Sequence, residues 1–104
     1  MAKKHPHEIQ KRIDRIKVEL TALDDLRPGS LTRQYKDPES QSGPYYQLSY
    51  TRDMKSRTEY IARHSVREVR RQIANYKRFK ALTAEWVSLS IEQSRLKMKL
   101  KRKP

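Results

Sequence analysis

At 104 residues, the chain is long enough for one small domain at most. Hydrophobic residues make up 35% and charged residues 36%, which excludes a large buried core. Lys and Arg number 25 against 12 Asp and Glu, and the formal net charge of +13 attracts polyanions such as nucleic acid. The absence of cysteine excludes disulfides and thiolate zinc sites. No apolar run approaches the roughly 20 residues of a membrane span and no signal peptide is visible, so we expect a cytoplasmic protein with no membrane contact.

The first predicted element is a helix over residues 6–26. Pro6 suits the first helical turn, Glu8 favours the positive end of the helix dipole, and the sequence RPG after residue 26 ends the pattern. The apolar residues alternate between spacings of four and three, at Ile9, Ile13, Ile16, Leu20 and Leu23. This spacing is typical of a coiled-coil seam, which requires a partner helix.

Residues 27–44 are predicted to form a loop, because RPGSLTRQYKDPESQSGP is rich in Pro, Gly and Ser, with one short turn near Leu31 to Tyr35. A β-hairpin over residues 45–62 follows. Its arms, YYQLSYT and KSRTEYIA, are rich in Tyr and Thr, and Asp53 and Met54 lie at the apex. Without a glycine at the apex, a four-residue loop around a type I turn is favoured over a tight type I′ turn.

Either loop pairs Thr51 with Ser56, which assigns the hairpin residues to two faces. One face has an apolar base and a cationic tip, with Tyr46, Leu48, Tyr50 and Arg52 opposite Ile61, Glu59, Arg57 and Lys55. We expect Tyr46 and Tyr60 to pack on the long helix that follows.

That helix is predicted over residues 65–100. Ser65 and Glu68 form a capping box, and no Gly or Pro interrupts the chain until Pro104. An apolar stripe in its first half is expected to cover the hairpin, and a heptad-like stripe in its second half to pair with the first helix. The sequence therefore predicts one α+β domain over residues 1–104, mostly α-helical, with an antiparallel coiled-coil-like helix pair and a basic tail over residues 97–104.

Three apolar residues of the long helix, Val87, Ile91 and Met98, lie off both stripes. Such a leftover strip indicates self-association, so these residues are the candidates for a homodimer contact.

Most of the positive charge lies in the second half of the chain. Residues 65–80 carry a net charge of +5 and residues 81–104 a net charge of +4, whereas residues 1–26 carry only +1. On a helical wheel one strip is cationic, with Arg67, Arg71 and Arg78 flanked by Arg70 and Lys77. Like charges at i and i+4 destabilise a helix slightly, so the strip favours binding to phosphate over a purely solvated face.

The hairpin tip repeats this pattern. Arg52 and Lys55 flank the turn, and Arg57 lies across from Tyr50. Like charges across two strands destabilise an isolated hairpin, whereas a phosphate between them relieves the repulsion. The tyrosine ring can stack on the guanidinium or on a base, so Tyr50 is a candidate for both packing and binding.

No residue pattern predicts catalysis. The sequence has no glycine-rich phosphate loop, no thiol and no spaced acid–base pair, and His5 and His7 are a poor metal pair. We therefore expect no enzyme activity, no catalytic residue, no metal site and no cofactor.

The words LRPGSLTRQY, GPYYQLSYT, KSRTEYI and the segment from Val66 to Lys97 resemble an uncharacterised family of small bacterial proteins. The resemblance covers nearly all of the chain after the first helix and implies a place beside transposases in mobile elements. Many members carry a cysteine cluster after the residues that match Gln34 and Tyr35. Here Lys36 to Ser42 read KDPESQS, so no metal site carries over. The strand–turn–strand–helix order also looks like a reduced arm-binding module of tyrosine recombinases.

Two functional hypotheses follow. In the first, the protein is a non-enzymatic accessory protein that binds nucleic acid, with duplex DNA favoured and RNA as the variant, in the bacterial cytoplasm and on the nucleoid when bound. In the second, it is a helical adaptor or inhibitor that binds a transposase or another nucleic-acid enzyme through its apolar seams. Salt dependence of nucleic-acid binding separates the two.

Overall fold

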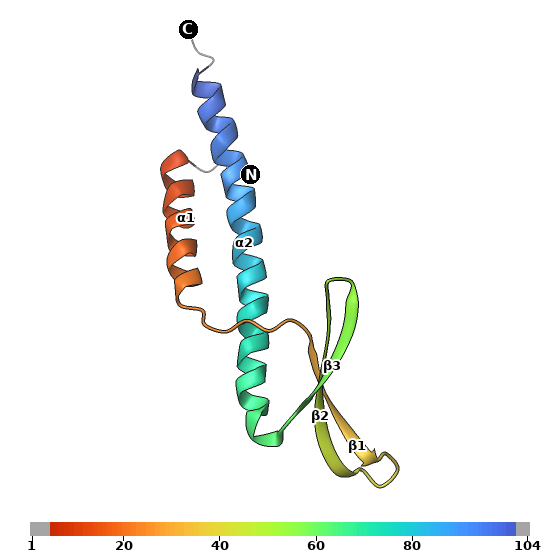
Figure 1. Ribbon diagram of the computed structural model, residues 1–104. Helices are drawn as coiled ribbons and strands as arrows, with labels where there is room; N and C mark the ends of the chain where they lie inside the picture. The colour runs from red at the N-terminus through yellow and green to blue at the C-terminus, as the bar shows by residue number, and fades with distance from the viewer. Residues whose placement is uncertain (1–4, 102–104) are drawn as a thin grey trace. The chain divides into compact units, whose positions relative to one another are not determined.

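The computed structural model describes residues 5–101 (Figure 1). Its elements, in chain order, are α1 (Pro6–Thr21), β1 (Ser30–Asp37), β2 (Ser42–Arg52), β3 (Lys55–Ile61), the short 3₁₀ helix η1 (Arg63–Ser65) and α2 (Val66–Lys101). This order confirms the predicted α+β class, with helices at both ends and a hairpin between them. The part of the predicted basic tail over residues 97–101 is the last turn of α2, and residues 102–104 lie outside the described residues.

The described residues form two compact units. The helix-pair unit combines the residues up to Leu23 with those from Arg78 onward, and the sheet unit comprises Asp24–Lys77. Helix α2 contributes to both units, because no Gly or Pro interrupts it.

The helix-pair unit is held together by the predicted seam. Ile9, Ile13 and Ile16 of α1 are buried against Leu82 and Leu89 of α2. Polar contacts flank this core, between Gln10 and Gln93, Arg12 and Glu85, and Glu19 and Arg78. Residues early in α1 meet residues late in α2, so the pair is antiparallel, as predicted.

Helix α1 ends at Thr21, five residues before the predicted end. No basic side chain lies in its last turn, and Asp24 and Asp25 follow it. Carboxylates are unfavourable at the negative end of a helix dipole. Here the side chain of Asp24 and the backbone carbonyl of Asp25 instead accept hydrogen bonds from Asn75 on α2, which draws the chain out of the helix.

The sheet has three antiparallel strands in the order β1-β2-β3. The prediction of a loop over residues 27–44 is therefore wrong over Ser30–Asp37, which forms β1. Leu31 lies opposite Leu48 and packs against the buried cluster, so burial at the open edge of β2 stabilises a strand where local composition indicates a loop.

The register of the hairpin is confirmed, with Thr51 opposite Ser56. Its turn differs from the expected type I loop. Asp53 has φ 53° and Met54 has φ 64°, which is a two-residue turn of type I′. The twist of a type I′ turn matches that of the flanking strands, and this match outweighs the cost of a left-handed methionine.

The core of the sheet unit lies between one face of the sheet and the first turns of α2. Leu48, Ile61 and Val69 are buried there, and Tyr46 packs against them. The predicted covering of the hairpin by the long helix is thus confirmed. The expected packing of Tyr60 on this helix is wrong, because Tyr60 points to the other face and is 70% exposed.

Candidate nucleic-acid interface

The segment that joins α1 to β1 passes over α2 and reaches the hairpin inside the sheet unit (Figure 1). The backbone N–H of Arg27 donates to the carbonyl of Gln72 on α2 (3.2 Å), and its guanidinium forms an ion pair with Glu59 on β3. Gly29 has φ 119°, and a Cβ there would lie 2.6 Å from the carbonyl oxygen of Ser49 on β2. The crossing segment, residues 27–29, therefore closes against the strands at a position that only glycine fits.

Beyond this crossing, the hairpin continues as a two-stranded ribbon. β1 pairs with β2 only as far as Ser49, so the tip consists of β2 and β3 (Figure 1). Arg52 lies opposite Lys55, and Arg57 lies opposite Tyr50. The three cationic side chains are exposed, and none forms an ion pair with another residue in 5–101. We call Arg52, Lys55 and Arg57 the cationic tip.

Tyr50, which pairs with Arg57 of the tip, makes contacts inside the sheet unit. Its half-buried side chain packs against the cluster around Leu48, and the guanidinium of Arg27 lies 5.8 Å from the centroid of its ring. A cation over an aromatic ring at this distance is attracted to the face of the ring. Part of the Tyr50 ring is thus engaged inside the protein, and its contact with nucleic acid stays a prediction.

Three cations of α2 remain available in the sheet unit. Arg67, Arg70 and Lys77 are exposed, and no ion pair involves them in the described part of the chain. Arg70 and Lys77 line a hollow of about 310 Å³ together with Gly29 and Ser30 at the start of β1. We call Arg67, Arg70 and Lys77 the helix cations.

The crossing segment connects the two groups of cations. A Cβ at Gly29 would lie 3.0 Å from the Cβ of Tyr50, which pairs with Arg57 of the tip. On its other side, Gly29 lines the hollow with Arg70 and Lys77. The first turns of α2 and the ribbon therefore present unpaired positive charge on either side of the same short segment.

Arg71 does not belong to this set, contrary to the prediction. Its guanidinium donates a hydrogen bond of 2.5 Å to Asp24 and others to Glu68. These ion pairs raise the pKa of Arg71 above its ordinary value. The hydrogen bond from Arg71 also lowers the pKa of Asp24 and that of Glu68. Two carboxylates thus neutralise a side chain that the helical wheel assigns to phosphate.

Arg78 is also occupied, by Glu19 on α1 at 2.7 Å. It belongs to the helix-pair unit, whereas Arg67 and Arg71 belong to the sheet unit. The predicted strip of Arg67, Arg71 and Arg78 is therefore not one cationic surface, because the fold supplies acids to two of its three members.

Sequence reasoning overlooked the charges of β1. Arg33 lies over the ring of Tyr35 at 5.3 Å, and Lys36 is exposed near the end of the strand. Both fall in the segment that the composition assigns to a loop. Leu31 and Tyr35 fall on one face of a period-two pattern, with the polar Thr32 and Gln34 on the other, and this is the signal that could have revealed the strand.

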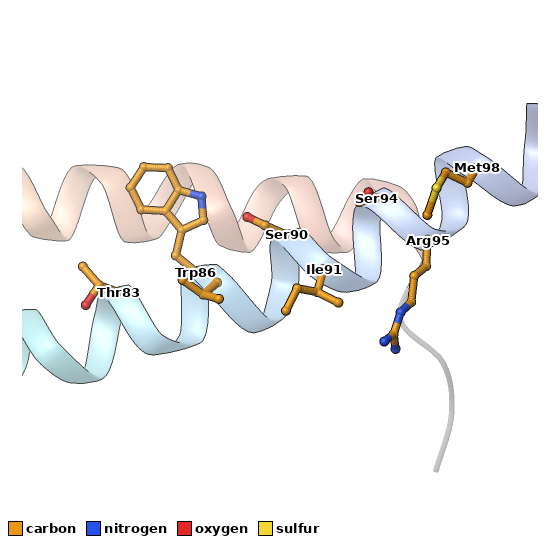
Figure 2. A pocket seen from close by; sticks show the side chains of 8 residues that line it. Thr83, Trp86, Ser90, Ile91, Ser94, Arg95 and Met98 are labelled. Atoms are coloured by element: carbon orange, nitrogen blue, oxygen red, sulfur yellow. The ribbon is translucent and has the colours of Figure 1, made fainter.

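The helix-pair unit carries the predicted apolar strip. Val87 is 59% exposed, Ile91 49% and Met98 54%. These residues lie on the face of α2 roughly opposite Leu82 and Leu89, which α1 covers. They line a hollow of about 660 Å³, which Figure 2 shows along α2.

The described residues hold no group of three or more His, Cys, Asp or Glu side chains that could bind a metal ion. Within residues 5–101, no helix is long and apolar enough to cross a membrane.

A family model described as a domain of unknown function (DUF6788) matches residues 6–71. The match includes α1, the crossing segment, the whole sheet and the start of α2 up to Arg71. It thus also covers the first helix, which the resemblance noted from the sequence left out. Neither a curated protein nor a solved structure matches the chain. Because the family model spans more than half of the residues, the chain belongs to the DUF6788 family.

Proposed function

We propose that the protein is a non-enzymatic nucleic-acid-binding protein whose sheet unit is the binding module. The observation that carries this proposal is the group of six exposed cations without ion pairs in residues 5–101, namely the cationic tip and the helix cations. The fold directs Asp24, Glu59 and Glu68 to Arg27 and Arg71, which leaves the charge of the six unneutralised. Unpaired cations on two adjacent elements suit a chain of phosphates.

Duplex DNA is the favoured ligand because of the shape of the tip. The major groove, about 12 Å wide, admits a two-stranded β-ribbon. In this proposal the ribbon that carries Arg52, Lys55 and Arg57 enters the groove. Arg67, Arg70 and Lys77 then contact phosphates beside it, which positions the protein without reading sequence.

The biological setting is proposed from the resemblance alone. Proteins of the resembled group are often encoded beside transposases, so we propose an accessory role in a mobile genetic element of a bacterium. The protein would then act in the cytoplasm and lie on the nucleoid when bound to DNA.

A titration across salt concentrations tests the proposal. If about six phosphates are neutralised, the logarithm of the affinity for random-sequence duplex DNA falls against log salt with a slope near −5. Fluorescence anisotropy of a labelled duplex measures this slope. Replacing both Arg52 and Arg57 with Gln should reduce the slope by about 2, whereas replacing both with Lys keeps the charge and the slope. A flat salt dependence contradicts the proposal.

Competition separates the two kinds of duplex. At about 150 mM salt, where surface charges are screened beyond about 8 Å, unlabelled duplex DNA should displace the labelled DNA at lower concentration than structured RNA does. The deep, narrow major groove of an RNA duplex does not admit the ribbon, so the reverse order would assign the cations to RNA.

A second candidate function is that of a helical adaptor, and the apolar strip on α2 favours it. Val87, Ile91 and Met98 are half-exposed on one face of α2 and line the hollow of about 660 Å³, with Ser94 and Arg95 between Ile91 and Met98. Large exposed apolar residues in a row mark protein contacts. The occupant would be a second copy of the chain, a transposase or another nucleic-acid enzyme.

Polar replacement of the strip tests this second function. Val87→Ser with Ile91→Ser should convert a dimer to a monomer in sedimentation velocity if a second copy covers the strip. The matched control is Ser88→Ala, an exposed position on the same helix. If the wild-type protein is a monomer and the double variant binds DNA as well as the wild type does, the strip contributes neither to self-association nor to DNA binding.

A further inference from the structure

Within residues 5–101, the buried cluster of the sheet unit includes no side chain from the face of the sheet that points away from α2. Side chains alternate along each strand, and the helix packs on the face of Leu48 and Ile61. The opposite face is formed by the remaining strand positions, Ser30, Thr32, Gln34, Lys36, Gly43, Tyr45, Gln47, Ser49, Thr51, Ser56, Thr58 and Tyr60. Within these three described strands, it carries hydroxyls, amides and two tyrosines, with one cation and no carboxylate.

A diagonal track crosses this face from β1 to β3. Lys36 lies diagonally from Tyr45, because residue 45 pairs with Gln34. Tyr45 in turn lies diagonally from Tyr60, which pairs with Gln47. Diagonal neighbours on adjacent strands are about 7–8 Å apart, so aromatic and long side chains reach one another. The track therefore consists of a cation followed by two aromatic rings.

The track is open to a ligand. Tyr60 is 70% exposed, and with Tyr45 and Lys36 it lines a hollow of about 620 Å³. Gly43, next to Lys36, has no side chain, and a Cβ there would meet the aliphatic stem of Lys36 at 3.0–3.2 Å. The lysine stem thus lies across the position of Gly43, which presents no side chain of its own.

We propose that this face binds single-stranded nucleic acid, with bases stacked on Tyr45 and Tyr60 and a phosphate at Lys36. Each base has a flat π surface that an exposed tyrosine accommodates, and a nearby cation holds the backbone. A duplex cannot use such a track, because its bases are already stacked on each other. The absence of carboxylates from the face removes repulsion of the phosphates. This second ligand site extends the proposed function and uses none of its six cations.

Binding of labelled single strands tests the proposal. The probes are oligo(dT) and oligo(U) of about 12 nucleotides, a length within the range that one binding module covers. Tyr60→Ala should weaken binding of both by about fivefold to a hundredfold, the loss expected for one stacked base. Tyr60→Phe is the matched control and should bind within about twofold of the wild type, because it retains the ring. A preference for one probe identifies DNA or RNA as the source of the strand.

Duplex binding separates this proposal from the proposed function. Tyr60→Ala should leave the affinity for duplex DNA within about twofold of the wild type, whereas replacing Arg52 and Arg57 with Gln should reduce it. The proposal is overturned if Tyr60→Ala binds single strands normally. It is also overturned if Tyr60→Ala weakens both ligands equally while its circular dichroism matches that of the wild type. If the tip variants lose duplex binding while Tyr60→Ala keeps its single-strand binding, the proposed function stands and the single-strand site does not.

Discussion

The guanidinium of Arg71 lies 2.5 Å from Oδ1 of Asp24 and also binds Glu68, so two carboxylates neutralise its charge at the protein surface. Arg67, one turn earlier on α2, has no ion pair within the described residues. Two arginines four positions apart on one helix thus have different electrostatic roles.

This difference predicts unequal salt slopes. Arg67→Gln should reduce the slope of log affinity for duplex DNA against log salt by about 0.9, because one phosphate contact is lost. Arg71→Gln should leave the slope unchanged, since Arg71 contacts Asp24 and Glu68 in place of phosphate. Anisotropy titrations of both variants measure the slopes. Equal reductions would show that Arg71 exchanges its carboxylates for phosphate on binding.

The same contact predicts acid sensitivity of the sheet unit. The hydrogen bond from Arg71 lowers the pKa of Asp24 below its ordinary value of 3.8 and that of Glu68 below 4.5. A carboxyl group whose pKa is lowered in the folded state stabilises the fold at pH values above its ordinary pKa. This stabilisation is lost as the pH falls through the lowered pKa. NMR titration of the carboxyl carbons should therefore give low values for both groups. Arg71→Gln should return them towards 3.8 and 4.5, and unchanged values would show that Arg71 is not their partner.

Gly29 should tolerate no side chain. Gly29→Ala combines a φ of 119° with an approach of 2.6 Å to a backbone carbonyl oxygen, so we expect a loss of about 1–3 kcal/mol in the free energy of unfolding. Gly43→Ala is the comparison and should cost less, because its φ of 64° carries left-handed strain but its close neighbour is the flexible side chain of Lys36 and not a backbone atom. Urea unfolding measures both, and an equal or larger loss for Gly43→Ala would contradict this account of the crossing segment.

The hairpin turn should gain from a glycine. Met54 has φ 64°, so its backbone is strained, and it is 98% exposed, so its side chain makes almost no packing contacts. Met54→Gly should raise the free energy of unfolding by about 1 kcal/mol, because glycine adopts the left-handed conformation without steric cost. Thermal unfolding measures the gain. Ser56→Gly, at an extended position just past the turn, should instead destabilise the hairpin. No gain from Met54→Gly would argue against the type I′ turn.

The helix-pair unit depends on the isoleucine seam. Ile13 is 3% exposed, so Ile13→Ala should cost about 2–5 kcal/mol through lost burial and a residual cavity. Val18→Ala, at a position that is 68% exposed on the same helix, should change stability by less than about 0.5 kcal/mol. Chemical unfolding followed by the fluorescence of Trp86 reports on this unit directly, because Lys17 of α1 lies 5.4 Å from its ring. A small effect of Ile13→Ala would place the core elsewhere.

Local patterns predicted those parts of the fold whose periodicity is strong. The spacing of Ile9, Ile13 and Ile16 predicts a helix that pairs with another, and the pattern around the hairpin predicts the pairing of Thr51 with Ser56. Both are correct because burial of one face sets the period and register of an element. The cationic tip was predicted in the same way, since a register assigns each side chain of the ribbon to a face.

Tertiary contacts decided the remainder. β1 forms because Leu31 pairs with Leu48 at the open edge of β2 and is partly buried there. The composition of residues 30–37 does not reveal this long-range contact. The candidate site changed most, since Arg71 is paired with an acid 47 positions away and Arg78 with one 59 positions away. Net charge is a property of composition, but a cation is available to a ligand only if the fold brings no carboxylate to it, and that depends on contacts between distant segments.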